Sequence, residues 1–222
     1  NALEAWANDW LAEAYPDMTR LEPNSPSGKI VVTSQLNDAL LDYLDRGGRV
    51  VLLSDGVLKD YRLGVELRPG ETLAAEAMGN FNALYPSPPW NTGTHGNMGT
   101  VVAEHPALGQ FPHQGWCNLQ FFYLISGAYP LLLEPYRPQR IEPIVRSIGH
   151  KNTLVDKAYL FEVRVGKGAL LATSFRLAAT YATHPEAKYL TEELLAYATG
   201  PRFQPMVAVS REQVAATVVP KK

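Results

Sequence analysis

The chain has 222 residues, a formal net charge of −2 and 46% hydrophobic residues. Acidic and basic residues are mixed along it, so no basic stripe is present to neutralise phosphates, and nucleic acid is excluded as the main partner. Its apolar runs are shorter than the roughly 18–20 residues that span a bilayer, which argues against a membrane partner. The single cysteine, Cys117, excludes an internal disulfide and a multi-cysteine metal site.

The first part of the chain predicts a helix followed by a strand–helix–strand unit. Apolar residues over 3–14 recur at helical spacing, which indicates an amphipathic helix. Residues 29–33 and 49–53 are short apolar runs that predict buried strands. Between them, leucines recur on one face of a predicted helix that begins at Ser34 as N-cap and ends at Gly47–Gly48. Such a unit pairs its two strands in parallel through a right-handed crossover.

The remainder alternates an irregular region with clearer elements. Residues 55–115 are rich in Gly, Pro, Asn and aromatic residues, and connections this long are usually functional or contact another domain. The elements predicted beyond them are a helix over 119–128, strands over 142–148, 157–165 and 169–174 with a tight turn at 165–168, a helix over 185–198 and a short helix from Ser210. This order predicts a three-layer α/β fold, with a mainly parallel sheet between helices and long irregular loops.

Two residues are candidate nucleophiles. Ser54 follows a strand, as nucleophiles of α/β enzymes do, but the glycine and the helix of a nucleophile elbow are missing around it. A serine in a turn or cap is the ordinary interpretation. Cys117 follows His113, which would serve as its base, yet it lies beside the apolar run 119–124. The pattern therefore favours a buried thiol that packs as a small hydrophobe.

Glu162 is the most unusual carboxylate because it lies within an apolar strand. Two readings stay open for it: a catalytic acid, or a structural group that makes an ion pair or hydrogen bond near the sheet. Glycoside cleavage would need a second carboxylate roughly 5–10 Å away. The histidines have none of the spacings typical of zinc sites, so we expect no metal and no cofactor; they are His95, His105, His113, His150 and His184.

Aromatic residues of the irregular region suggest a contact surface. Trp90 and Trp116 are candidates for stacking on sugar rings, and Phe81 and Tyr85 accompany them. The competing interpretation is that these side chains fill an interface with a neighbouring domain.

The order of several short motifs resembles one family. The motifs are His105-Pro106-Ala107-Leu108, Phe111-Pro112, Trp116 with Gln120, Pro143-Ile144-Val145, Phe161-Glu162-Val163 leading to Gly166 and Gly168, Pro185-Glu186-Ala187, Leu194-Leu195-Ala196-Tyr197, and Phe203 with Pro205. In this order they resemble the glutamine-amidotransferase-like, flavodoxin-like domain toward the carboxyl end of large bacterial glycoside hydrolases of family two and related β-galactosidase-like proteins. The resemblance spans residues 29–218, and its specificity lies in the order of the motifs.

The resemblance implies a fold of the amidotransferase class without the Cys-His-Glu triad of that class. It also implies that sugar hydrolysis belongs to a separate barrel domain, and that the protein is exported to a periplasm or cell surface. One departure concerns residues 148–150, where the family often carries an acidic residue and this chain has Ile-Gly-His. Whatever role that acid has in the family is not carried over to this chain.

These observations together predict one domain over residues 1–222, excised from a larger glycoside hydrolase. The predicted function is that of a non-catalytic accessory domain whose partners are the other domains of the parent enzyme. Two other classes remain open. One is a free-standing hydrolase or amidotransferase-like enzyme acting through Cys117 or Glu162, and the other is a carbohydrate-binding module built on Trp90 and Trp116.

Overall fold

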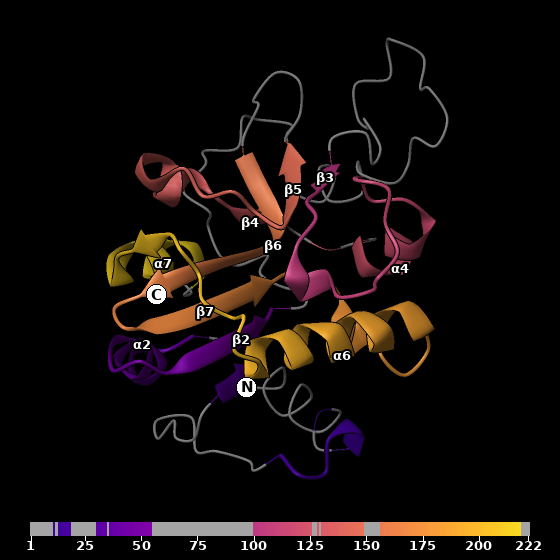
Figure 1. Ribbon diagram of the computed structural model, residues 1–222, viewed down its shortest axis with the longest axis horizontal. Helices are drawn as coiled ribbons and strands as arrows, with labels where there is room; N and C mark the ends of the chain where they lie inside the picture. Colours follow the sequence, from indigo (N-terminus) through magenta and orange to yellow (C-terminus); the bar gives the residue numbers. More distant parts are fainter. Residues whose placement is uncertain are drawn as a thin grey trace, which may run out of the picture.

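The computed structural model describes residues 11, 13–18, 30–34, 36–54, 100–125, 128, 130–148 and 156–218 (Figure 1). Its strands are β1 (Ile30–Thr33), β2 (Arg49–Leu53), β3 (Thr100–Val102), β4 (Leu131–Leu132), β5 (Val145–Ile148), β6 (Asp156–Val165), β7 (Gly168–Thr173) and β8 (Ala208–Val209). Its α-helices are α2 (Asp38–Asp45), α4 (Phe122–Ile125), α5 (Leu177–Thr180), α6 (Pro185–Thr199) and α7 (Arg211–Val218). Three 3₁₀ helices accompany them: η2 (Pro106–Leu108), η3 (Leu119–Phe121) and η4 (Glu134–Gln139).

The strands form one mixed sheet in the order β1-β2-β7-β6-β5-β3, with β4 and β8 also pairing with β6. The α/β class and the predicted parallel β1–α2–β2 unit are confirmed. The prediction of a mainly parallel sheet is wrong, because β6 pairs antiparallel with β7, β5 and β4, and β5 pairs antiparallel with β3. The parallel pairings are confined to β1–β2, β2–β7 and β6–β8.

Two hydrophobic clusters cover the opposite faces of the sheet. Successive side chains of a strand point to opposite faces, and in β2 the side chains of Val50 and Leu52 join one cluster while Val51 and Leu53 join the other. The first, which we call the α2–α7 cluster, includes leucines of α2 and residues of η4 and α7. The second includes the buried face of α6 together with η2, η3 and α4. Figure 1 shows α6 and α4 together at the right of the molecule, and α2 and α7 together at its left.

Several element boundaries differ from those that the sequence predicts. The N-cap of α2 is Asn37 and not the predicted Ser34, because the Asn37 side chain accepts a hydrogen bond from the Leu40 amide at 2.9 Å. The predicted helix over 119–128 is a 3₁₀ turn followed by a single α turn. The predicted strand over 142–148 begins only at Val145, two residues after Pro143, which has no amide to donate to a ladder.

Some predictions fall partly or wholly outside the described residues. Of the predicted amino-terminal helix, Leu11, Glu13 and Ala14 are helical, and the rest lies outside the described ranges. Most of the irregular region 55–115, including Trp90, also lies outside them. Within the part of the chain that the structure describes, no helix has the length and apolar character needed to cross a bilayer.

Candidate functional site

The structure brings Glu162 together with two residues that are far from it in sequence. Glu162 lies in the middle of β6, between Phe161 and Val163, whose side chains are buried in the α2–α7 cluster. Strand alternation therefore directs the carboxylate to the other face, where α6 packs. Tyr197 comes from the last turn of α6, and His105 comes from the residue that caps η2. We call Glu162, Tyr197 and His105 the carboxylate cluster.

Hydrogen bonds define the geometry of the carboxylate cluster. The Tyr197 hydroxyl donates to Glu162 Oε2 at 2.8 Å, and the Arg202 carbonyl lies 3.3 Å from the same hydroxyl. His105 Nε2 lies 3.8 Å from Glu162 Oε1, and the His105 ring meets the Tyr197 ring edge to face at 5.5 Å. The Ala107 amide donates to His105 Nδ1 at 3.2 Å. In the neutral imidazole this leaves the proton on Nε2, the atom that faces the carboxylate.

The carboxyl end of α6 is anchored so that Tyr197 is held in place. Arg49 at the start of β2 donates from Nη1 to the carbonyls of Ala198 and Gly200, at 3.2 Å and 2.9 Å. These are carbonyls at the end of the helix, which a guanidinium can satisfy. The Arg49 guanidinium also lies 5.9 Å from the centre of the Phe203 ring, which itself packs against Tyr197.

Burial shifts both titrating groups of the cluster toward their neutral forms. The Glu162 and His105 side chains are 15% and 25% exposed. Burial raises the pKa of Glu162, and the hydrogen bond from Tyr197 partly offsets this by lowering it. Burial lowers the pKa of His105. The pKa of Tyr197 is raised, first by burial and then by its bond to Glu162, so its hydroxyl stays a donor at all ordinary pH values.

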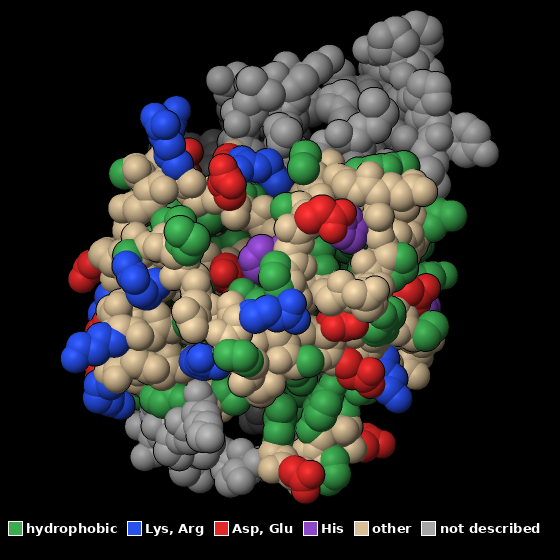
Figure 2. Space-filling model, in the orientation of Figure 1, with side chains coloured by type: hydrophobic (Ala, Val, Ile, Leu, Met, Phe, Trp, Pro, Cys, Tyr) green, Lys and Arg blue, Asp and Glu red, His purple; other side chains and the backbone are tan. Residues whose placement is uncertain are grey.

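This arrangement can hold or transfer one proton near the surface. A carboxyl group of raised pKa beside an imidazole of lowered pKa is the combination that general acid–base catalysis uses. Figure 2 shows histidine next to acidic side chains at two places on the visible face of the molecule. The carboxylate cluster supplies one carboxylate and one imidazole, whereas glycoside cleavage commonly uses two facing carboxylates. Its strongest bond, between Tyr197 and Glu162, ties α6 to β6.

Both candidate nucleophiles, Ser54 and Cys117, are buried within the domain. Ser54 is completely buried at the end of β2, and its hydroxyl donates to the Thr173 carbonyl at 2.9 Å. Cys117 is also completely buried, and burial raises the pKa of its thiol to about 12, although a hydrogen bond with Thr100 acts in the opposite direction. His113, the predicted base, has its Nδ1 facing the Gly115 amide at 3.3 Å. The thiolate that a cysteine nucleophile requires is therefore disfavoured here.

We expect Cys117 to be unreactive in the folded protein. An aromatic disulfide reagent at neutral pH should modify it only after unfolding in urea, because the reagent reacts with exposed thiolate. The measurement is the absorbance of the released thiol with and without urea. Fast modification of the native chain would show that the thiol is accessible and would restore Cys117 as a candidate nucleophile.

Of the other predicted contact and metal candidates, the described ones have different neighbours, and Phe81, Tyr85, His95 and His150 lie outside the described residues. Trp116 is half-buried, and Trp90 lies outside the described residues. His113 Nε2 lies 3.9 Å from the fully exposed Glu104, and the ring of His184 stacks on Tyr123 at 3.7 Å. Among the described residues, no group of three or more His, Cys, Asp or Glu side chains has the geometry to hold a metal ion.

Sequence reasoning identified Glu162 but missed its partners. Tyr197 was visible as an apolar position of a predicted helix and as the end of the motif Leu194-Leu195-Ala196-Tyr197, and His105 as part of a motif and as a possible ligand of a metal. No sequence signal connects positions that are 35 residues apart on β6 and α6. The one available signal was that Glu162, His105 and Tyr197 all belong to the motifs that carry the family resemblance.

The fold and the carboxylate cluster together define an α/β domain with a mixed sheet, helices on both faces and a partly buried carboxylate at the α6 face. A family model described as a domain of unknown function (DUF8487) matches residues 31–219. The chain belongs to this family. No curated protein matches the chain.

Proposed function

We propose that the chain is a non-catalytic accessory domain of a multidomain glycoside hydrolase, which packs against and supports the sugar-cleaving domain. The observation that carries the proposal is that the candidate catalytic groups are buried or hydrogen-bonded within the domain. Ser54 is hydrogen-bonded to the neighbouring strand, the Cys117 thiol is buried, and the Glu162 carboxylate accepts a hydrogen bond from Tyr197. The order of the sequence motifs supports the choice of parent enzyme.

The fold is compatible with this role. Helices on both faces and the parallel segment β1-β2-β7 support a flavodoxin-like, three-layer arrangement of the glutamine-amidotransferase-like type around those strands. Large hydrophobic side chains are exposed on neighbouring elements of the α6 side, namely Leu119 in η3, Tyr123 in α4 and Tyr189 in α6. A neighbouring domain of the parent enzyme is the partner that we expect to cover them.

A hydrolytic enzyme is the second candidate, because the structure places His105 beside Glu162. Under this alternative, Glu162→Gln abolishes turnover of a substrate while the free energy of unfolding stays close to that of the wild type. The accessory role instead expects the chain to show no turnover of aryl glycosides. A carbohydrate-binding module would bind sugar through Trp116 and Trp90, and Trp116→Ala would then weaken the affinity without unfolding the domain.

The mass of the native polypeptide tests the accessory role. An antibody raised against this chain should detect, in an extract of its source organism, a band several times larger than 24.5 kDa. A second assay would measure release of nitrophenol from a panel of aryl glycosides by the chain alone, and we expect none. A native band near 24.5 kDa, or turnover that Glu162→Gln removes, would overturn the proposal.

A further inference from the structure

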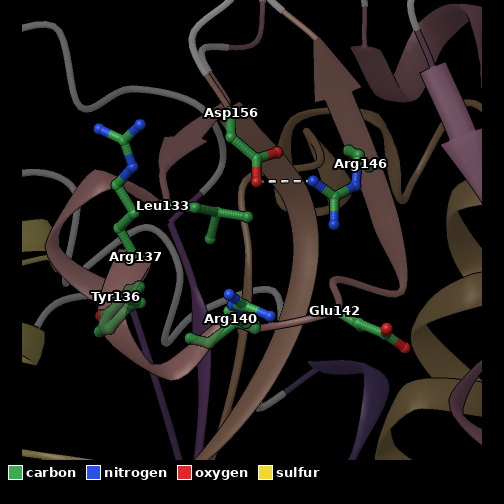
Figure 3. Close-up of a pocket in the computed structure, with 8 residues that line it drawn as sticks. Leu133, Tyr136, Arg137, Arg140, Glu142, Arg146 and Asp156 are labelled. Atoms are coloured by element: carbon green, nitrogen blue, oxygen red, sulfur yellow. Dashed lines mark hydrogen bonds and ion pairs between the residues drawn. The ribbon is translucent and has the colours of Figure 1, made fainter.

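A pocket of about 290 Å³ lies between η4 and the strands β5 and β6, outside the carboxylate cluster (Figure 3). It is close to the lower end of the size range of small-molecule sites, which suits a ligand of one ring. Its lining comes from the end of β4, from η4 and the segment after it, and from β5 and β6; the lining residues are Leu133, Tyr136, Arg137, Arg140, Ile141, Glu142, Arg146 and Asp156.

Among the charged side chains that line this pocket, Arg140 has no acidic partner within the described residues. Arg146 Nη1 is paired with Asp156 Oδ2 at 2.6 Å, and the other N–H groups of Arg146 have no partner among the described residues (Figure 3). Arg137 is paired with Glu134 at 3.2 Å, and both side chains are mostly exposed. Within the described part of the chain, the guanidinium of Arg140 makes no hydrogen bond or ion pair, and Figure 3 shows Glu142 pointing away from the other residues.

The remaining lining is apolar. Leu133, Tyr136 and Ile141 are all buried and form part of the α2–α7 hydrophobic cluster. These three side chains are only 1–6% exposed, so a ligand in the pocket meets chiefly the charged side chains, the guanidinium donors among them. A carboxylate is the group that a guanidinium binds with two parallel hydrogen bonds. A doubly charged phosphate is a poorer match, because Asp156 and Glu142 add negative charge to the same lining.

We propose that this pocket binds a single acidic sugar of the hexuronate type. Its carboxylate pairs with Arg140 and with the N–H groups of Arg146 that Asp156 does not take, and its ring fills the rest of the pocket. The choice of a sugar rests on the proposed function, since an accessory domain of a glycoside hydrolase meets carbohydrate. The requirement for a carboxylate rests on the uncompensated guanidinium alone.

Titration of the whole chain with glucuronate, followed by amide NMR shifts, tests this inference. We expect saturable shifts at the amides of Arg140 and Arg146, and an affinity for glucuronate at least about tenfold above those for glucose and for acetate. Glucose lacks the carboxylate and acetate lacks the ring. Equal affinity for glucuronate and either of these two probes, or shifts located elsewhere, would overturn the proposal.

Two substitutions locate the contact. Arg140→Asn removes the guanidinium and keeps a residue that tolerates the left-handed backbone of this position, where φ is 50°. It should weaken glucuronate binding about tenfold or more. The matched control is Arg164→Ala, an exposed arginine of β6 outside the pocket lining, which should change the affinity less than about twofold. Equal losses for the two variants would contradict the assignment.

The two proposals fail in different experiments. Absence of glucuronate binding would overturn the hexuronate pocket and leave the accessory role intact, because that role is tested by the mass of the native polypeptide and by aryl glycoside turnover. A small native polypeptide would overturn the accessory role, while a measured preference for glucuronate would still establish the pocket.

Discussion

Replacing Gly168 by alanine is expected to lower the free energy of unfolding by about 3 kcal/mol, measured by urea denaturation of the whole chain. Gly168 begins β7, where the strand passes close to the carboxyl end of α2. A Cβ atom at this position would lie 2.9 Å from Leu44 Cα and closer still to the carbonyl oxygens of Leu44 and Gly48. All three are backbone atoms, so the clash cannot be relieved by rotating a side chain.

A second glycine provides the control. Gly115 has a φ of +83°, and a Cβ added there would meet nothing within 4 Å. Gly115→Ala therefore tests the conformational cost alone, which is about 1 kcal/mol. Gly168→Ala tests the steric cost, since its backbone lies outside the left-handed region. If Gly168→Ala destabilises the chain no more than Gly115→Ala, the close approach of β7 to α2 is absent in solution.

Tyr197→Phe should destabilise the domain by about 2 kcal/mol at pH 7.5. The substitution keeps the ring that packs on Phe203 and removes the hydroxyl that donates to Glu162. A buried carboxylate is then left without its best hydrogen bond, and this costs more than the loss of a bond between two neutral groups. The measurement is again the free energy of unfolding in urea.

The size of this effect should depend on pH. The pKa of Glu162 is raised in the folded state, so the folded protein binds the proton more tightly, and stability is lost as the pH rises from about 4.3 through the folded pKa. Loss of the Tyr197 hydroxyl raises that folded pKa further, because the bond that lowered it is gone. The destabilisation caused by Tyr197→Phe should therefore grow as the pH rises and shrink where Glu162 is protonated.

A double-mutant cycle separates the pH dependence of stability that Glu162 causes from the one that His105 causes. The lowered pKa of His105 acts in the opposite direction, because stability is lost as the pH falls below about 6.5. In the Glu162→Gln background, Tyr197→Phe should have an effect that does not vary with pH. Tyr189→Phe, at an exposed tyrosine of the same helix, should leave the stability unchanged. A pH-independent effect of Tyr197→Phe in the wild-type chain would contradict the proposed hydrogen bond.

The parallel part of the sheet was predictable because its signals are local. A strand, a helix and a strand within 25 residues leave one practical geometry, and β1, α2 and β2 adopt it. The antiparallel part had a local signal too, since the turn at Gly166 and Lys167 can only join antiparallel strands. The prediction of a mainly parallel sheet assumed that the parallel pairing of the βαβ unit continues through the later strands. The turn at Gly166 and Lys167 indicates the opposite for β6 and β7.

The short strands were beyond sequence analysis. β4 and β8 have two residues each and β3 has three, so none shows a period. They are strands because β5 and β6 offer them free backbone donors and acceptors, and that partnership exists only after the sheet has formed.

By itself, the sequence determined the α/β class, the β1–α2–β2 unit, the long helix after Pro185 and the anomaly of Glu162, because each depends on residues close together in the chain. Only the tertiary structure decided which partners a buried polar group has. Glu162 meets Tyr197 and His105, and Arg140 comes to line a pocket with Asp156 of β6. These contacts follow from how the helices lie on the sheet, and chain proximity carries no information about that packing.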